Sequence, residues 1–205
     1  MYQKGERRKA EIVRATLRLI GARGTDAVTH RAVAREAGVP LSATTYYFDS
    51  RDELLQQALL LAAREETERL EELVLQLAPL SLSVGEWARA VAAQIAADLE
   101  SEPAKHIALF ELGLEAARTD ALRGELQSWQ EAHVRLAEMG CRAVGSADPE
   151  LDARIVVSTL IGLMLQQLTT RRHDFEEAVL RPVLTRLFGR LAAGGPEPAV
   201  STASA

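Results

Sequence analysis

The side chains best suited to catalysis or metal binding are few in this chain. Its histidines are at positions 30, 106, 133 and 173, and none follows a glutamate by three residues, so the Glu-x-x-His pairs of di-iron bundles are missing. Glu102 lies four residues before His106, but Pro103 stands between them at an expected helix start and no second pair accompanies them. Gly-rich phosphate loops and Ser or Cys nucleophile motifs are also missing. The sequence therefore predicts neither an enzyme nor a metal or cofactor site.

Two other features that can carry chemistry have simpler explanations. Glu111 and Glu115 lie four residues apart on one helix face, which is typical of a solvated acidic surface. Cys141 is the only cysteine, so it cannot form an internal disulfide or a Cys-based zinc site. We therefore look for the function in binding surfaces rather than in catalysis.

The elements that position the remaining side chains are helices. Of the 205 residues, 47% are hydrophobic and 26% charged, which is enough to bury the core of one domain or two small ones. Apolar residues recur with a helical period in almost every segment. The longest uncharged stretch, residues 155–170, is shorter than the roughly 20 apolar residues of a membrane span, so we expect a buried helix there and no membrane partner. The first residues lead into an amphipathic segment instead of an export signal, which predicts a cytoplasmic protein.

Charge is unevenly distributed along the chain. Residues 1–48 hold nine Lys and Arg against four acidic residues, whereas the whole chain has a net charge of −5. An acidic protein with a basic N-terminal head can place that head against a polyanion while its body repels nonspecific contacts. The head is thus a candidate for nucleic-acid binding, and an ordinary solvated face is the alternative.

Three helices are expected in this head. An amphipathic helix with arginines along its polar side ends at Gly24. Thr29 is suited to cap a short helix over residues 30–37, which Gly38 closes. A third short helix has Pro40 in its first turn, where the missing N–H of proline costs nothing.

Longer helices are expected in the body. Residues 50–53 (SRDE) form a capping box, and the apolar stripe behind them predicts a helix of about 26 residues that ends before Pro79. Turn and cap residues divide the rest into helices over residues 83–100, 104–118, 120–144, 149–171 and 174–192. Pro182 either kinks the last helix or marks its true start. Residues 194–205 are Gly, Pro, Ser, Thr and Ala with few others, which predicts a disordered tail.

Residues 33–39 meet the requirements of a helix-turn-helix. Ala34 is small enough to let two helices approach, and Gly38 can adopt the left-handed turn conformation. The core between the two helices comes from Val33, Ala37 and Val39. Two such short helices cannot fold alone, so the first helix must cover them. The second of them then offers side chains suited to base edges in a major groove, namely Leu41, Ser42, Thr45 and Tyr46.

Residues 29–39 (THRAVAREAGV) and 45–55 (TYYFDSRDELL) resemble the DNA-binding region of the tetracycline-repressor (TetR) family of bacterial regulators. The resemblance implies a homodimer with two N-terminal DNA-reading heads that binds a double-stranded operator. It also implies a C-terminal helical domain that binds a small-molecule effector, and repression that this ligand relieves. The helical remainder of the chain is compatible with the family without being diagnostic of it.

Roles for individual residues of the head follow from the resemblance. Thr29 and Tyr47 lie where family members contact phosphate, and Arg31 lies where they can reach a guanine. Arg51 is the basic residue that opens the fourth helix, and is expected at a phosphate. The base-facing start of the recognition helix is occupied by Leu41, Ser42 and Ala43.

This chain departs from the family pattern in the recognition helix. In the commoner family pattern this start is polar and contains a Lys and a Gly-Thr pair, whereas residues 40–43 of this chain are Pro, Leu, Ser and Ala. Thr45 lies where an aromatic residue is common. Base readout is therefore expected from methyl contacts and from Arg31, Ser42, Thr45 and Tyr46. We expect Phe48 in the core and Tyr47 at the surface, while the alternative places both in the core with Tyr46.

The helices expected after residue 50 carry apolar stripes that a few polar residues interrupt. They are expected to face inward in a bundle, where pockets between helices commonly bind small molecules. Plain core packing is the alternative for each residue. The candidate effector-binding residues are Trp87, Val91, Phe110, Leu114, Trp129 and His133, a lining that suits a largely apolar ligand.

Two C-terminal helices are more hydrophobic than one small domain needs. They predict a two-fold four-helix dimer interface, with a deep monomer core as the alternative. The candidate interface residues are Val156, Leu160, Leu163, Val179, Val183 and Leu187.

The sequence thus predicts an all-α protein of two domains. Residues 1–50 form a three-helix DNA-binding domain with a helix-turn-helix, and residues 51–193 form a helical bundle for ligand binding and dimerisation. The expected function is that of a cytoplasmic repressor released from its operator by a small, largely apolar molecule. The alternatives are an activator, a DNA-associated interaction protein without effector control, and a small helical enzyme.

Overall fold

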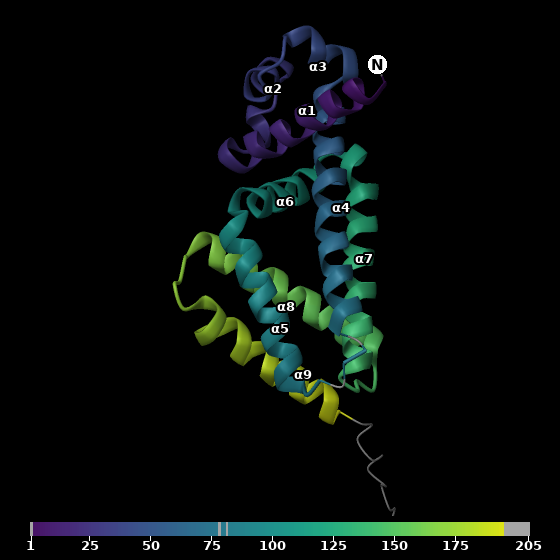
Figure 1. The fold of residues 1–205 in the computed structure, drawn as a ribbon, viewed down its shortest axis with the longest axis vertical. Coiled ribbons are helices and arrows are strands. Elements are labelled where there is room, and N and C mark those ends of the chain that lie inside the picture. The colour runs from purple at the N-terminus through teal and green to yellow at the C-terminus, as the bar shows by residue number, and fades with distance from the viewer. Residues whose placement is uncertain (1, 78, 81, 195–205) are drawn as a thin grey trace, which may run out of the picture. The chain divides into compact units, whose positions relative to one another are not determined.

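The computed structural model describes residues 2–77, 79–80 and 82–194, and these contain helices and no strand. The helices are α1 (Tyr2–Arg23), α2 (His30–Ala37), α3 (Leu41–Tyr47), α4 (Arg51–Leu77), α5 (Val84–Ser101), α6 (Pro103–Ala116), α7 (Asp120–Ala143), α8 (Pro149–Thr169) and α9 (Arg181–Ala193) (Figure 1). A 3-10 turn, η1 (Thr25–Ala27), follows α1, and a π-helical segment, η2 (Phe175–Leu180), precedes α9. The all-α prediction is confirmed. Of the predicted tail over 194–205, all but Gly194 lies outside the described residues.

Contacts divide the chain into two compact units. Unit 1 comprises Met1–Leu70 and Ala97–His133, and unit 2 comprises Glu71–Ala96 and Val134–Ala205. Unit 1 therefore holds the three-helix head together with α6 and the N-terminal parts of α4 and α7. The functional boundary at residue 50 stays a prediction.

Side-chain caps fix the ends of the short helices as the sequence indicates. The Thr29 hydroxyl accepts a hydrogen bond from the backbone N–H of Ala32 at 3.1 Å, and Gly38 closes α2 with a left-handed φ of 65°. The capping box at the start of α4 is confirmed, because the Ser50 hydroxyl accepts from the Glu53 N–H at 3.1 Å. Pro40 caps α3 rather than lying in its first turn.

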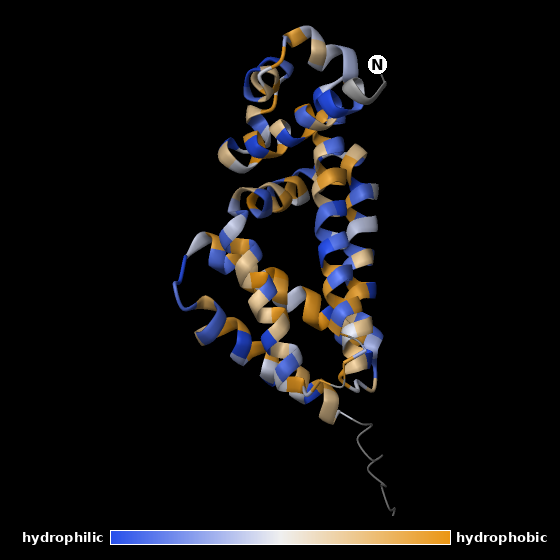
Figure 2. Ribbon diagram, in the orientation of Figure 1, coloured by the Kyte–Doolittle hydropathy of each residue, from blue (hydrophilic) through white to orange (hydrophobic). Residues whose placement is uncertain are grey.

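A single core runs through unit 1. It joins buried side chains of α1 and α4 to those of α6 and to Leu122 of α7. In Figure 2 hydrophilic and hydrophobic residues alternate along α1 and α4, as expected of amphipathic helices. At the contact between α1 and α6, a Cβ on Gly21 would lie 2.1 Å from the Ala104 carbonyl oxygen. Only glycine lets these two backbones come so close.

The prediction for the buried face of α6 is wrong. Leu114 is 62% exposed and Ile107 is also exposed, while Phe110 is half-buried. The face that packs inside unit 1 carries instead Lys105, His106, Ala108, Leu109, Leu112 and Ala116. A helix with apolar residues on several sides gives no clear direction from sequence, whereas the close approach of the Ala104 backbone to Gly21 fixes how α6 lies on α1.

The expectation that residues 155–170 form a buried helix is also wrong. In α8, the buried side chains are Ala153 and Val156, whereas the opposite face exposes Leu151, Ile155, Ile161 and Leu165. Within the described part of the chain, α8 is the one helix long and apolar enough to span a membrane, and 11% of its most apolar stretch is buried. Length and composition do not by themselves indicate a membrane, because helices of soluble proteins pass the same test.

Pro182 lies in the first turn of α9. The π-helical segment η2 precedes this turn, and α9 itself begins at Arg181. The sequence left open whether this proline kinks a helix or marks its start, and the structure selects the start.

Candidate nucleic-acid interface and pocket

A helix-turn-helix is built from α2 and α3 and anchored by a buried threonine. The Thr44 hydroxyl donates to the carbonyl oxygen of Leu41 at 2.8 Å and lies 3.3 Å from that of His30, at the start of α2. Thr44 is fully buried, and its 3.3 Å contact with the His30 carbonyl oxygen is the one that links α3 to α2, while the shorter bond stays within α3. Sequence reasoning passed over Thr44, because the sequence alone does not distinguish this buried threonine from its exposed neighbour Thr45.

The outward face of α3 carries most of the residues predicted to read bases. Leu41, Ser42 and Thr45 are exposed, and Tyr46 is 80% exposed. Ala43 differs, because it packs against the core of unit 1. The Thr45 hydroxyl lies 3.4 Å from the carbonyl oxygens of Leu41 and Ser42, so it is engaged with the backbone of its own helix.

The two aromatic residues that end α3 divide between surface and core. Phe48 is buried, as predicted, and Lys9 places its ammonium 5.7 Å from the centre of the Phe48 ring. Tyr47 is half-buried, with its ring edge-on to that of Tyr46 at 5.0 Å. A Cβ on Gly5 would lie 3.4 Å from the Tyr47 hydroxyl, so that hydroxyl is next to the first turns of α1.

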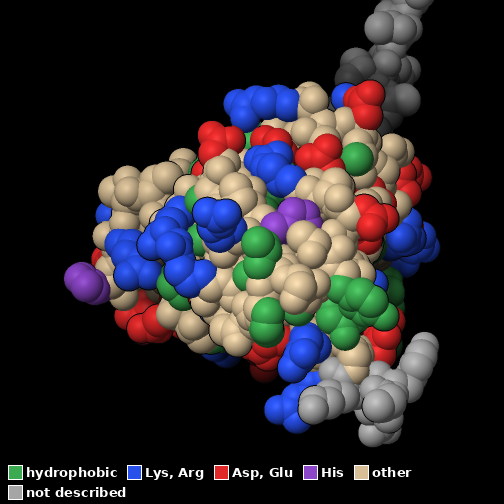
Figure 3. Space-filling model, turned by 90° about the horizontal axis from the view of Figure 1, so that it is seen from above, with side chains coloured by type: hydrophobic (Ala, Val, Ile, Leu, Met, Phe, Trp, Pro, Cys, Tyr) green, Lys and Arg blue, Asp and Glu red, His purple; other side chains and the backbone are tan. Residues whose placement is uncertain are grey.

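Basic side chains lie around this face with acidic ones between them. Thr29 and Arg31 are exposed at the start of α2. Arg18 is paired with Glu36 at 3.0 Å, which reduces its contribution to the positive potential. Figure 3, a view onto the end of the chain that carries α2 and α3, shows Lys and Arg side chains on several sides of a largely uncharged centre.

Arg51 lies apart from the α3 face and is engaged within the protein. Its guanidinium donates to the Thr25 carbonyl oxygen at 3.1 Å and lies 3.5 Å from the Glu115 carboxylate of α6. Asp26 and Asp52 are also within 4.0 Å of it.

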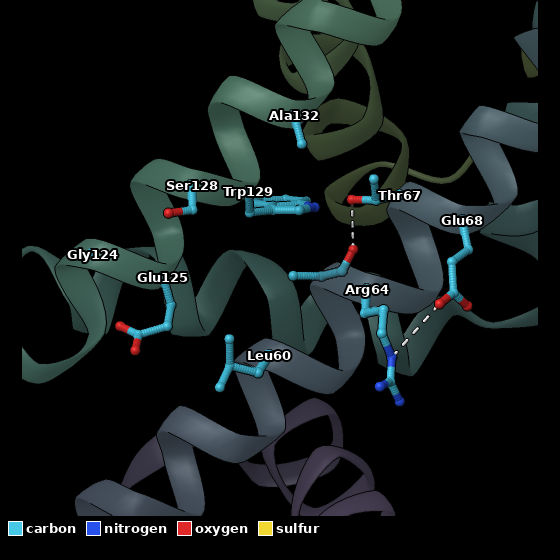
Figure 4. A pocket seen from close by; sticks show the side chains of 10 residues that line it. Leu60, Arg64, Thr67, Glu68, Gly124, Glu125, Ser128, Trp129 and Ala132 are labelled. Atoms are coloured by element: carbon cyan, nitrogen blue, oxygen red, sulfur yellow. Dashed lines mark hydrogen bonds and ion pairs between the residues drawn. The ribbon is translucent and has the colours of Figure 1, made fainter.

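An open pocket of about 480 Å³ lies between α4 and α7 in unit 1. From α4 it is lined by Leu60, Ala63, Arg64, Thr67 and Glu68, and from α7 by Gly124, Glu125, Ser128, Trp129 and Ala132. Figure 4 shows the Trp129 ring extending from α7 toward α4, near Thr67. Arg64 pairs with Glu68 at 3.7 Å, and the Glu125 carboxylate accepts a hydrogen bond from Gln56.

Of the six predicted effector residues, the structure brings Trp129 and His133 together. Their rings meet edge to face at 4.7 Å, and His133 Nδ1 is 3.0 Å from the Trp129 carbonyl oxygen. Trp129 lines the pocket, and its indole N–H is buried without a hydrogen-bond partner among the described residues. Phe110 and Leu114 are on α6, while Trp87 and Val91 belong to unit 2, where Trp87 is buried. Sequence reasoning missed the α4 side of the pocket, because a pocket wall has the same pattern as a solvated helix face.

A network of charges joins α4, α5 and α6 in unit 1, and its members Lys105, Glu66 and Asp98 are buried while Glu102 is exposed. The Lys105 ammonium contacts Glu102 at 2.8 Å and Glu66 at 3.4 Å, and Arg69 contacts both Asp98 and Glu102 at 2.9 Å. Hydrogen bonds from Lys105 and then Arg69 lower the pKa of Glu102 to about 2. The Glu102 carboxylate therefore forms ion pairs with two cations. These ion pairs give Glu102 a role that does not involve a metal shared with His106.

Burial is the largest cause of the pKa shifts of His106, His133 and Cys141. It lowers the pKa of His106 and of His133, because an imidazolium loses its hydration inside the protein. In unit 2 burial raises the pKa of the Cys141 thiol to about 11, which keeps it protonated and unreactive at neutral pH. Within the described residues, no group of three or more His, Cys, Asp and Glu side chains could hold a metal ion.

Two family models match the chain. The model described as "Bacterial regulatory proteins, tetR family" matches residues 12–58, and the model described as "Tetracyclin repressor-like, C-terminal domain" matches residues 82–190. The first covers the helix-turn-helix and the second more than half of the chain.

Known proteins agree with these models. A TetR-family member from Streptomyces coelicolor A3 is 31% identical over 88% of this chain and 97% of its own, with a TM-score of 0.71. The multidrug binding protein EbrR, in a complex with ethidium, is 33% identical over 88% of this chain and 98% of its own, with a TM-score of 0.64. The HTH-type transcriptional regulator PksA of Bacillus subtilis (strain 168) is 37% identical over 71 residues, and this match spans 35% of the length of PksA. Such regulators are transcription factors rather than enzymes, and the chain belongs to the TetR family of bacterial transcriptional regulators.

Proposed function

We propose that this chain is a homodimeric cytoplasmic repressor that reads its operator with α3 and releases it when a small molecule binds. The observation that carries the proposal is the exposed face of α3, held on a rigid helix-turn-helix by the buried Thr44. Its short polar and aromatic side chains are of the size that a major groove admits. A recognition helix needs this combination of a fixed backbone and an open side-chain surface.

Each part of the head has its own task in this proposal. Arg31, Ser42 and Tyr46 contact base edges, with methyl and apolar contacts from Leu41 and Thr45, while Ala43 packs against the core beneath them. Thr29 and Tyr47 hold phosphates, which sets the register of the head on the duplex without reading sequence. Phosphate contacts make the affinity fall as salt rises, because bound phosphates release their counterions.

A second copy of the chain covers the exposed apolar face of α8. Leu151, Ile155, Ile161 and Leu165 lie on one side of this helix and are in contact with solvent in the single chain. Burying apolar surface of this kind stabilises association by about 25 cal/mol per Å² before the cost of ordering the partners is counted. A two-fold dimer places two heads in successive major grooves, roughly 34 to 36 Å apart.

The pocket between α4 and α7 binds the effector. Trp129 offers an aromatic face, and Leu60, Ala63 and Ala132 add apolar surface beside it. These residues fit a flat, largely apolar molecule that accepts a hydrogen bond from the indole N–H of Trp129. The similarity to EbrR supports a planar aromatic ligand, since solved structures of that protein contain ethidium and proflavin.

Release follows if the ligand binds one arrangement of α4 better than another. The helix α4 carries one wall of the pocket and begins directly after the recognition helix. A ligand that moves α4 away from α7, or tilts α4 relative to α7, therefore changes the position of the head. The difference between the ligand's affinities for the two arrangements sets how much DNA binding is lost.

The DNA-binding role is tested by selecting genomic fragments on the purified protein and measuring mobility shifts on the best fragment. Arg31→Ala and Tyr46→Ala should each weaken specific binding by about 10- to 100-fold, and Tyr47→Phe should weaken it for all sequences. Arg123→Ala, on the exposed side of α7, is the control and should bind as the wild type does. Unchanged affinity in all three head variants would contradict the proposal.

Effector binding is tested with proflavin as a fluorescent probe. The wild type should bind the dye and lose affinity for its DNA fragment in its presence, and Trp129→Ala should lose both effects. Leu114→Ala is the control, because that side chain projects into solvent. Dye binding that is equal in the wild type and Trp129→Ala would overturn the pocket assignment. DNA release insensitive to any apolar compound would favour an interaction protein without effector control.

A further inference from the structure

Arg51 joins three segments of unit 1 that are distant in sequence. It is the first residue of α4, and its guanidinium donates to the Thr25 carbonyl oxygen of η1 at 3.1 Å. On its other side Nη1 lies 3.5 Å from Glu115 Oε1, near the end of α6. We call this set, Arg51 with Thr25 and Glu115, the Arg51 bridge.

Glu115 depends on this bridge for its charge compensation. Its side chain is 13% exposed, so little water reaches the carboxylate. The Thr119 hydroxyl donates a neutral hydrogen bond to it at 3.4 Å, and the second cation, Arg118, is farther away than Arg51, at 4.0 Å. A nearly buried carboxylate that loses its close cation is destabilising. Withdrawal of Arg51 toward a phosphate would therefore carry a cost within the protein.

The surroundings of Arg51 are also poorly suited to a phosphate. Three carboxylates lie within 4.0 Å of its guanidinium, from Asp26, Asp52 and Glu115. Three negative charges around the single positive charge weaken its attraction for a polyanion. Arg51 is only 35% exposed, and Asp26 and Asp52 occupy the more open positions around it.

The Arg51 bridge lies at one end of the contact surface between the head and α6. At the other end, α1 and α6 approach so closely at Gly21 and Ala104 that a Cβ would not fit. Between these points Gly24, with a φ of 77°, lies beside the Glu111 carboxylate, and a Cβ there would be 3.6 Å from it. The head thus packs against α6 from Ala104 to Glu115, and Arg51 connects this contact surface to the start of α4.

We propose that Arg51 is a positioning residue that ties the head to α6, and that it does not contact a DNA phosphate. In this arrangement the Arg51 bridge keeps α4, η1 and α6 moving as one body, so it sets the orientation in which α3 meets the groove. The inference rests on the proposed function for its effect on DNA, while the bridge itself is a property of the protein alone.

The first test measures operator affinity against salt for Arg51→Gln and Glu115→Gln. Both variants break the bridge, so both should weaken binding by a similar factor, on the order of 5- to 10-fold, with the slope of log affinity against log salt unchanged. A phosphate contact predicts otherwise, namely a slope smaller by about one for Arg51→Gln and equal or tighter binding for Glu115→Gln. That second pattern would overturn the inference.

The second test needs no DNA and separates this inference from the proposed function. Urea midpoints are measured for the wild type, Arg51→Gln, Glu115→Gln and the double variant. The double variant should lose less than the two single losses added together, because both remove the same contact. Additive losses would refute the bridge, even if DNA binding were intact. If the wild type binds no DNA, the proposed function falls and this cycle still decides the role of Arg51.

Arg51→Lys guards against a variant that fails to fold. Lysine keeps the charge but cannot reach the Thr25 carbonyl and the Glu115 carboxylate together as the guanidinium fork does. It should shift the urea midpoint in the same direction as Arg51→Gln and by a smaller amount. A midpoint equal to that of the wild type, with a normal salt slope for DNA binding, would count against the bridge.

Discussion

The two units of this chain treat polar and apolar side chains in opposite ways. Within the described residues, every buried polar or charged side chain belongs to unit 1, among them Glu66, Asp98, Lys105 and His106. Unit 2 exposes the apolar face of α8, with Leu151, Ile155, Ile161 and Leu165 in contact with solvent. Unit 1 pairs its buried Lys105 and Asp98 with charges of opposite sign, whereas unit 2 leaves an apolar helix face in contact with solvent.

This difference indicates how the two units gain their structural specificity. Buried ion pairs cost desolvation and give little net stability, but they tolerate few alternative packings. An apolar helix face gains its stability only when a second surface covers it. Unit 1 should therefore be sensitive to single internal changes, and unit 2 to changes that alter association.

The largest effect is expected from charges placed on the α8 face. Ile161→Asp combined with Leu165→Asp should convert the proposed dimer to a monomer, because an aspartate at a dry interface loses its hydration without gaining a partner. Sedimentation equilibrium measures the mass. The control is Leu114→Asp in unit 1, where a leucine that is more exposed than either α8 residue should tolerate the charge with no change in mass. A dimer that survives the double change would place the interface elsewhere.

The next largest effect concerns the buried ion pair of unit 1. Lys105→Met leaves Glu66 without its cation and should lower the free energy of unfolding by about 3–5 kcal/mol. Adding Glu66→Leu should recover most of that loss, since both charges are then gone. Chemical denaturation measures both. Arg123→Met, which breaks an exposed pair with Asp120, should cost at most about 1 kcal/mol. Equal losses at the two sites would mean that burial of the Lys105 pair has no consequence.

A smaller loss is expected where α1 crosses α6. Gly21→Ala places a methyl group against the Ala104 backbone, which cannot rotate away, and should destabilise by about 1–3 kcal/mol. Gly85→Ala in α5 meets no atom within 4 Å and should be neutral or slightly stabilising, by up to about 1 kcal/mol. Melting temperatures compare the two variants. A stabilising Gly21→Ala would show that α1 and α6 are not in close contact.

The smallest effect is a dependence of stability on pH. Because burial lowers the pKa of His106, the unfolded chain binds this proton more readily than the folded protein, so stability falls as pH drops below the ordinary histidine range. The limiting slope for one such group is about 1.4 kcal/mol per pH unit. Unfolding curves between about pH 7.5 and 5.5 should show this decline, and His106→Leu should reduce it to the part that comes from His133, whose pKa burial also lowers. An unchanged slope in that variant would assign the proton to another group.

Much of the fold could be predicted from the sequence because its signals are local. The cap at Thr29, the left-handed Gly38 and the capping box at Ser50 are all where the residue types place them. The helix-turn-helix and the family followed from the same short segments. These features depend on a few neighbouring residues, so no distant contact was needed to infer them.

The site was harder to predict, because it depends on which side of a helix faces which neighbour. Trp129 and His133 were named correctly as neighbours on one stripe, but Leu114 proved to be exposed. On α8 the predicted stripe, Val156, Leu160 and Leu163, is the inner face, and Val156 is buried within its own unit. That helix is apolar on both sides, so its periodicity carries no direction.

By itself, the sequence determined where helices begin and end and which segment carries the recognition helix, because capping bonds and turn conformations are decided by adjacent residues. Only the tertiary structure decided that the α6 backbone approaches Gly21 of α1, that Lys105 and Glu66 meet in the interior, and that Arg51 faces Glu115. Such contacts join residues tens of positions apart. The type of a charged or apolar residue does not decide whether its side chain faces solvent, the core or a partner, because the packing of the helices decides this.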